Sequence, residues 1–499
     1  MKKIRIILFL LLGIFVFVPV LRAQITTCAI SGRVTGNDGE ALPGAVILIT
    51  HLPSGSVSRT VTNTNGWYHV EGLRAGGPYT LKASYLGYQP TVYTQINLQL
   101  GNRDDVNIEM KGADIELKDL VVTGNKSSAR TGTSTQITSR QLTTVPTLNR
   151  SISDFTKLSP YAGRNNTFAG RDGRYNYVSI DGAPLNDNFG LSSNYMPGGN
   201  AQPISLDVLE NIRIDVAPFD VKYSNFTGAA VNAVTKSGTN DFSGTAYGYF
   251  RPKSFSGKSI DGIDIPNAQT RHSELYGITL GGPIIKNKLF FFINGEIENE
   301  SYPGVQWRPS EDGVGDVTQK ISRTSAGDMK RMSDFLQSQY GYSTGKYNNF
   351  DNFSGFNWKI MARVDWNINL KNKLTLRYNG VQSKNDDLVN SSSFGGYRDS
   401  RVGDASMAFE NSNFKYKNKV MSVVGELNSQ FTPFIFNKFL ATYSYVNDTR
   451  EIYGSPFPFV DIDKNGKQYM SFGSEIFTPG NDVTSKVLSF IDNLSLIHI

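Results

Sequence analysis

Residues 281–300 read "GGPIIKNKLFFFINGEIENE", in which a short apolar run changes within a few positions into a series of spaced glutamates. With a period of two, Leu289 and Phe291 fall on one side of a strand, and Glu296 and Glu298 fall on the other. A helix would mix these two sets. The pattern therefore predicts a β-strand of a membrane barrel, with its apolar face on lipid and its glutamates facing a wet interior.

The same alternation recurs further along the chain, at about the ten-residue length of a tilted transmembrane strand. The clearest segments are residues 358–368, 374–380, 421–427 and 439–445. Tight turns at 286–288 and 371–373 alternate with long polar segments at 300–356 and 384–417. Short turns at one end and long loops at the other are typical of outer-membrane barrels. We therefore expect antiparallel transmembrane β-barrel strands with long extracellular loops over residues 241–499.

A barrel that encloses an internal domain needs roughly 22 strands, and this region supplies about eight. The chain also ends in "DNLSLIHI", without the aromatic terminal strand of a finished barrel. We expect an incomplete barrel and read the chain as the N-terminal portion of a longer protein.

Composition and charge agree with a large, mainly β protein. Aromatic residues make up 12% of the 499 residues, and there are 48 glycines. The net charge of +6 is mild, and the charges are interspersed. Because the sequence contains no basic stripe or basic run, we do not expect the protein to bind nucleic acid.

The first residues are typical of an export signal, which we place at residues 1–23. Lys2 and Lys3 precede an apolar run at 6–20, and cleavage is expected after Ala23. An uncleaved inner-membrane anchor is the alternative, but the run is short for a spanning helix. The only cysteine, Cys28, permits no intrachain disulfide. The residues before it do not suit a lipidated N-terminus, so a buried or incidental thiol is expected.

Residues 25–112 contain about seven short strands separated by turn signals, a pattern that predicts a small β-sandwich. Ile47 and Ile49 belong to a strand that is apolar on both faces and is therefore expected to be central. "SGRVTGNDGEALPGAVI" and "TNTNGWYHVEGLRAGGPYTLKASYLGY" resemble the carboxypeptidase regulatory-like domain, a prealbumin-like sandwich. None of the chain's four histidines has a partner at zinc-binding spacing, so neither a metal site nor enzymatic activity is expected.

Residues 113–136 are rich in Ser, Thr and Gly and are predicted to be a linker. They contain one short segment of high β propensity, which is either the last strand of the sandwich or a segment that adds to a partner's sheet edge. This segment resembles a TonB box, the contact of outer-membrane receptors with the energy-transducing protein TonB. The residues that carry this resemblance are Asp119, Leu120, Val121, Val122 and Thr123.

Residues 137–236 predict a compact α+β unit, in which Ser205 caps a short helix before a strand. "RDGRYNYVSIDGAPLNDNFG" and "LDVLENIRIDVAPFDVKYSNFTGAAVNAVTKSGTN" resemble the plug domain of TonB-dependent receptors, close to the Oar-like (OmpA-related) subgroup. The positions that match the plug motif are Asp181, Gly182, Pro218, Phe219, Gly228, Asn232, Thr235 and Gly238.

The resemblance implies a TonB-dependent receptor of the outer membrane, with a periplasmic N-terminal domain, that takes up a scarce glycan, peptide or chelate. It implies TonB with ExbB and ExbD as partners, contact with outer-membrane lipid and an unidentified extracellular ligand, and it leaves open a surface lipoprotein. It implies no cofactor. The alternative is a structural or secretion-related surface protein. A calcium-like loop at 461–472 has Phe472 where the bidentate glutamate is required, so an ordinary turn is expected there.

Overall fold

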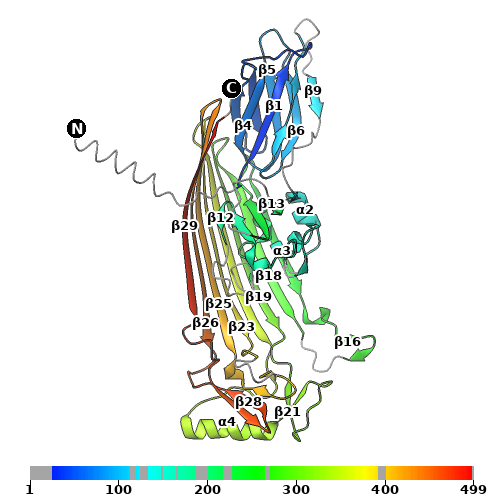
Figure 1. Ribbon diagram of the computed structural model, residues 1–499, viewed down its shortest axis with the longest axis vertical. Helices are drawn as coiled ribbons and strands as arrows, with labels where there is room; N and C mark the ends of the chain where they lie inside the picture. Colours follow the sequence, from blue (N-terminus) through cyan, green and yellow to red (C-terminus); the bar gives the residue numbers. More distant parts are fainter. Residues whose placement is uncertain are drawn as a thin grey trace, which may run out of the picture.

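The structure is a computed structural model that describes residues 25–112, 120–123, 133–147, 150–164, 167–185, 201–216, 227–264, 270–391 and 400–496. The predicted export signal lies outside these residues. The chain is mainly β, as predicted, with few helices. A β-sandwich lies at one end of the long axis, a large sheet runs along the middle, and a lobe with a helix lies at the other end (Figure 1).

The N-terminal sandwich consists of two sheets around one apolar core. The first has the order β4-β1-β7, with β8 also paired with β1, and the second has the order β3-β2-β5-β6-β9. The strands are β1 (Cys28–Thr35), β2 (Val46–His51), β3 (Ser56–Val61), β4 (Trp67–Leu73), β5 (Gly76–Ser84), β6 (Thr91–Leu98), β7 (Arg103–Asp105), β8 (Ile108–Glu109) and β9 (Leu120–Thr123). β2 is central, as its two apolar faces predicted. Cys28 is buried in the core, and its burial raises the pKa of the thiol.

A separate five-stranded sheet, here named the central sheet, has the order β10-β13-β14-β11-β12. Its strands are β10 (Thr133–Thr138), β11 (Tyr177–Ile180), β12 (Ala183–Pro184), β13 (Leu209–Val216) and β14 (Ala229–Thr235), and it is accompanied by α2 (Ser139–Thr144), α3 (Ile152–Thr156), η2 (Gly173–Tyr175) and η3 (Leu206–Val208). Ser205 caps η3, and its side chain accepts a hydrogen bond from the Asp207 amide. The predicted short helix is a single 3₁₀ turn, because β13 begins at Leu209.

The eight-stranded sheet, here named the barrel sheet, has antiparallel strands in strict chain order, and β15 and β29 form its edges. The strands are β15 (Ser243–Arg251), β18 (His272–Ile285), β19 (Leu289–Tyr302), β22 (Phe353–Asn367), β23 (Asn372–Asp387), β25 (Phe414–Thr432), β26 (Ile435–Ile452) and β29 (Asp482–Leu496). The tight turn predicted at 286–288 joins β18 to β19. The turn that joins β22 to β23 spans residues 368–371, so the turn predicted at 371–373 is displaced and overlaps β23, which begins at Asn372. These turns lie at the sandwich end (Figure 1).

The two faces of the barrel sheet differ as the alternation predicted. Outward-facing apolar side chains stay exposed in the isolated chain; they include Ile293, Ile297, Ile360, Leu376, Val423, Phe439 and Leu488. Their neighbours along the same strands point inward and are buried, among them Lys359, Arg377 and Ser422. An apolar belt of this kind is stable against lipid and costly in water.

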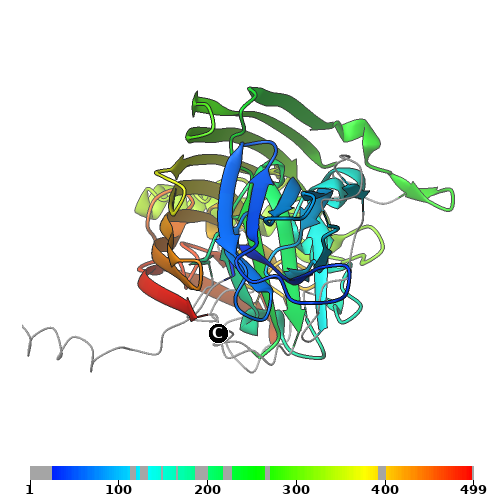
Figure 2. The ribbon, with the colours of Figure 1, turned by 90° about the horizontal axis from the view of Figure 1, so that it is seen from above.

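The inner face of the barrel sheet covers the central sheet. Viewed from the sandwich end, the barrel sheet curves around the segments inside it (Figure 2). Inward side chains from four of its strands, Phe292, Met361, Val381 and Val420, join the same buried cluster as Ile137 and Val231 of the central sheet. The two sheets therefore share one core.

The long loops at the end opposite the sandwich contain structure that the sequence analysis did not predict. They hold α4 (Ala326–Tyr340), the short strands β16 (Ser259–Ile260), β17 (Ile263–Asp264), β20 (Arg308–Ser310), β21 (Ile321–Ser325), β24 (Met407–Ala408), β27 (Val460–Lys464) and β28 (Lys467–Phe472), and the 3₁₀ turns η4 (Lys253–Phe255) and η5 (Glu410–Ser412). α4 begins at the side-chain cap of Ser325 and ends at Gly341, whose φ is 64°. Met329 and Leu336 of α4 pack with aromatic residues of β28 in a separate core.

Candidate functional site

The candidate site begins at the turn between β11 and β12, where the predicted motif residues Asp181 and Gly182 have φ of 45° and 80°. Both values lie in the left-handed region, which suits an Asp-Gly pair. The Asp181 carboxylate accepts two hydrogen bonds from Thr235 at the end of β14, one from the amide at 2.8 Å and one from the hydroxyl at 2.6 Å. Asp181 and Thr235 thus lie together and join two strands of the central sheet.

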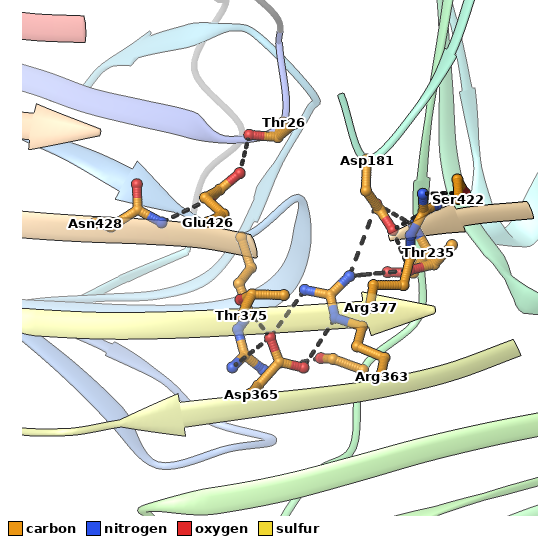
Figure 3. Close-up of polar contacts among 12 residues, drawn as sticks. Thr26, Asp181, Thr235, Arg363, Asp365, Thr375, Arg377, Ser422, Glu426 and Asn428 are labelled. Carbon is orange, nitrogen blue, oxygen red and sulfur yellow. Dashed lines mark hydrogen bonds and ion pairs between the residues drawn. The ribbon is translucent and has the colours of Figure 1, made fainter. Parts of the chain in front are cut away.

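Two arginines of the barrel sheet approach this pair from the other side (Figure 3). Nη1 of Arg377 on β23 lies 3.2 Å from Oδ2 of Asp181, and Nη1 of Arg363 on β22 lies 3.8 Å from Oδ1. Arg363 also donates to the carbonyl oxygen of Thr235 at 2.8 Å. The side chain of Arg377 is fully buried and forms its ion pair with Asp181. Since water does not reach this guanidinium, the Asp181 carboxylate is its main counter-charge.

The N-terminal sandwich reaches the same place through Arg74. Arg74 donates to the hydroxyl of Ser237 at 2.8 Å, and its Nη2 lies 3.4 Å from Oδ1 of Asp365 on β22. Asp365 in turn accepts two hydrogen bonds from Arg363, at 2.9 and 3.0 Å. The resulting chain of alternating charges, here named the junction network, is Arg74–Asp365–Arg363–Asp181–Arg377.

Further polar contacts surround the junction network. Glu426 on β25 accepts a hydrogen bond from the hydroxyl of Thr26 at 2.5 Å (Figure 3), and Lys373 on β23 donates to Ser58 of the sandwich at 2.8 Å. A cavity of about 180 Å³ opens here and is lined by residues of all three bodies, including Glu210 of the central sheet. The contact between sandwich, central sheet and barrel sheet is therefore polar and hollow rather than a dry apolar seam.

His51 on β2 lines the same cavity, and its Nδ1 lies 2.7 Å from the hydroxyl of Ser54. Burial, aided by the positive charges of Arg74 and Lys373, lowers the pKa of His51 to about 3. Because the unfolded chain binds a proton near pH 6.5, the His51 contribution to stability is complete above that pH and is lost as pH falls toward 3.

We expect acidification from pH 7.5 to 5.5 to lower the free energy of unfolding of the sandwich by about 1.4 kcal/mol through His51 alone. Urea unfolding of the wild type and of His51→Gln at both pH values measures this difference. The variant should lose that part of the pH dependence. Between pH 7.5 and 8.5, the free energy of unfolding should change with pH by the same amount in the two proteins. Equal losses in both proteins at pH 5.5 would show that His51 does not carry the effect.

The other motif residues of the central sheet have packing roles. Asn232 on β14 accepts a hydrogen bond from Ser179 at 2.7 Å, inside the sheet. At Gly228, a Cβ would lie 2.2 Å from the side-chain oxygen of Asn176. At Gly238, a Cβ would lie 2.3 Å from the carbonyl oxygen of Phe291, so the backbone there touches the barrel sheet directly. Pro218 and Phe219 lie outside the described residues.

Among the spaced glutamates, Glu296 makes a second contact between the central sheet and the barrel sheet, whereas Glu298 and Glu300 pair with residues of the barrel sheet and its loops. Glu296 accepts hydrogen bonds from Ser205 at 2.6 Å and from Lys359 at 2.6 Å. Glu298 accepts one from Asn357, and Glu300 pairs with Arg271 at 3.2 Å. The inward direction was predicted, but the wet lumen is wrong for Glu296, because the cap of η3 covers it. A cavity of about 560 Å³, lined by Glu298, Glu300 and Arg271, lies beside this contact.

The segment that resembles a TonB box is a strand of the sandwich. Leu120–Thr123 forms β9, which pairs in parallel with β6 from Thr91↔Leu120 to Thr94↔Thr123. Asp119 lies outside the described residues. The segment is thus the edge strand of a sheet, which was one of the two alternatives from the sequence, and its contact with TonB stays a prediction.

The calcium-like segment 461–472 is the β27–β28 hairpin, with Asn465 and Gly466 at positive φ in its turn. Asp461 forms an ion pair with Arg401 at 2.8 Å. In the described part of the chain, no group of three acidic, His or Cys side chains is arranged to hold a metal ion.

Sequence reasoning identified Asp181 and missed the other four members of the junction network. Arg363, Asp365 and Arg377 belong to the strands predicted at 358–368 and 374–380, where alternation puts them opposite the apolar face, but no role was assigned to them. The signal was present, because two arginines and an aspartate at inward positions of a barrel require buried counter-charges. Arg74 carried no such signal in the sequence.

Comparisons with known proteins agree with this architecture. Residues 29–111 match the family described as carboxypeptidase regulatory-like domain, and residues 234–312 match the outer membrane beta barrel domain. The chain therefore combines these two domains and is an outer-membrane protein, as predicted. It is 27% identical over 271 residues to the TonB-dependent transporter Oar of Myxococcus xanthus, which confirms the resemblance to TonB-dependent receptors.

That alignment covers 50% of this chain and 25% of Oar, so the chain spans about a quarter of the curated relative's length. Similar solved structures include the outer membrane transporter YddB of Escherichia coli, with 12% identity, a TM-score of 0.46, and coverage of 73% of this chain and 46% of YddB. The ferric enterobactin receptor of Pseudomonas aeruginosa has 12% identity, a TM-score of 0.44, and coverage of 73% and 47%. Among the described residues, no helix is long and apolar enough to cross a membrane.

Proposed function

We propose that the protein is a TonB-dependent outer-membrane transporter in which residues 137–236 form the plug, residues 25–112 form a periplasmic sandwich, and residues 119–123 contact TonB. The observation that carries this proposal is the position of the central sheet, which lies against the inner face of membrane strands and is held there by the junction network. A domain held in this way blocks a lumen and can be moved.

The junction network suits a part that must move. Its buried ion pairs are costly to break while they stay dry, but they border the cavity of about 180 Å³, in which water can solvate the groups once they separate. Force applied through the linker reaches β10 first, because β10 begins at Thr133, within the last residues of the predicted linker 113–136, and forms an edge of the central sheet. Strands would then leave one after another, starting at that edge.

The ligand enters from the side of the long loops. The cavity of about 560 Å³ beside Glu298 and Glu300 presents both charge signs and the aromatic residues Tyr249 and Tyr302. This lining supports a polar ligand, and the resemblance to transporters supports a glycan, a peptide or a metal chelate. Transport needs no covalent chemistry, so we propose no enzymatic activity.

We expect Val121→Pro to weaken binding of the TonB C-terminal domain by 100-fold or more. Strand addition uses backbone N–H groups, and proline removes one and fixes φ. The full chain in detergent and the purified TonB domain suffice for a calorimetric measurement. Ser128→Pro, in the linker beyond the predicted contact, is the matched control and should bind like the wild type. Equal affinity of wild type and Val121→Pro would refute the proposed contact.

A further inference from the structure

The predicted TonB contact is already a paired strand. β9 joins the edge of the sandwich by pairing with Thr91–Thr94 of β6, and β6 pairs with β5 on its other side. Strand addition to a partner requires a free edge and free backbone groups. One edge of β9 is occupied by the chain's own sheet.

The path of the chain brings the linker back to this edge. The amide of Gln89 donates to the carbonyl oxygen of Lys111 at 2.8 Å, and Tyr88 forms a bridge with Gly112. The last residues before the linker are therefore tied beside the start of β6, and β9 lies beside the next residues of the same strand. Gly112 and Leu120, the described residues on either side of 113–119, therefore both lie at one sheet edge.

The pairing of β9 is short. It involves four residues in parallel orientation, whereas the antiparallel pairs inside the sandwich extend over as many as six. Parallel pairing is also slightly less stable per residue. A strand held by so few bonds is among the first parts of a domain to open, so it can leave without unfolding the sandwich.

We propose, resting on the function above, that β6 of the sandwich and TonB compete for residues 120–123: the sandwich holds the contact segment in the resting protein, and TonB binds it only after it leaves β6. The N-terminal domain is then an autoinhibitory partner of the segment that couples transport to energy.

A disulfide across the β6–β9 pair tests the docked state without TonB. Val92 and Val121 are register partners, and neighbouring strands place such Cα atoms about 5 Å apart, within the range of a disulfide. In a Cys28→Ala background, Val92→Cys with Val121→Cys should oxidise readily. In the control pair, Asn97→Cys with Val121→Cys, residue 97 lies about 16 Å further along β6 than Val92, so this pair should not form a disulfide. Failure of the first pair to oxidise would overturn the docked state.

The same variant tests competition. Oxidised Val92→Cys/Val121→Cys should bind the TonB C-terminal domain at least 30-fold more weakly than its reduced form, and reduction should restore binding. Leu48→Cys with Arg59→Cys, partners on β2 and β3, is the matched control, and its oxidation should leave binding unchanged. Equal binding of the oxidised and reduced test forms would overturn competition and show that TonB adds to the outer edge of β9.

A synthetic peptide of residues 117–125 separates this proposal from the function on which it rests. The peptide has no β6 to compete with TonB and should bind the TonB domain more tightly than the reduced protein does. If neither the peptide nor the reduced protein binds, the proposed TonB contact is wrong and competition is wrong with it. The disulfide result would still report on whether β9 is docked.

Discussion

Replacing Asp181 with asparagine should destabilise the attachment of the central sheet to the barrel sheet by about 3 kcal/mol, the cost of removing one partner of a buried ion pair. Asparagine tolerates the left-handed conformation of residue 181, so the turn before Gly182 should survive. The lost charge leaves the fully buried guanidinium of Arg377 without its main counter-ion. Arg363 is affected less, because it keeps its two hydrogen bonds to Asp365.

The measurement is the urea midpoint for proteolytic cleavage within residues 137–236 of the full chain in detergent. Asp334→Asn removes a carboxylate from an exposed pair with Lys330 on α4 and is the matched control, with no shift expected. Combining Asp181→Asn with Arg377→Met should recover most of the loss, because the unpaired buried charge is then gone. An unchanged midpoint in the single variant would show that the junction network does not hold the central sheet.

The sequence predicted the strand directions and faces well, because they follow from local alternation. Glu296 and Ile293 differ by an odd number of positions, so they must point to opposite faces wherever the strand lies. The tight turn at 286–288 was equally local, whereas the one predicted at 371–373 was displaced toward β23, which begins at Asn372. The fold class followed from these features and from the resemblance to known receptors, and the structure and comparisons agree with it.

The junction network could not be predicted, because its members come from three separate bodies. Arg74, Asp181 and Arg377 are far apart in sequence, and their meeting depends on how the sandwich, the central sheet and β23 are placed. Helix α4 is a different case. Its cap Ser325 and its terminal Gly341 are visible in the sequence, but the polar composition of the loop obscured its two buried positions.

The short segment at 119–123 shows that two interpretations of one sequence can be compatible. High β propensity beside a sandwich predicted a last strand, and the resemblance predicted a contact with TonB. β9 is a strand of the sandwich at residues 120–123. The proposed competition joins the two interpretations, since a segment that can pair with the sheet edge of a partner can also pair with a sheet edge of its own chain.

The second large effect is expected at Gly238, where alanine should cost about 3 kcal/mol, the upper end for overpacking a well-packed contact. A Cβ at this position would lie 2.3 Å from the carbonyl oxygen of Phe291 and 2.7 Å from that of Gly282. Both are backbone atoms of paired barrel strands, so they cannot rotate away as a side chain would. The chain leaving the central sheet would have to move off the barrel sheet.

Gly295→Ala is the matched control. Gly295 lies on β19, as Phe291 does, and a Cβ at Gly295 would meet nothing within 4 Å. Thermal unfolding of both variants in detergent, followed by circular dichroism, should show a clear loss for Gly238→Ala and none for Gly295→Ala. Proteolysis of Gly238→Ala should begin within residues 137–236, because the strain falls where the central sheet joins the barrel sheet. If Gly238→Ala unfolds like the wild type, the chain at residue 238 does not lie as close to β18 and β19 as the structure places it.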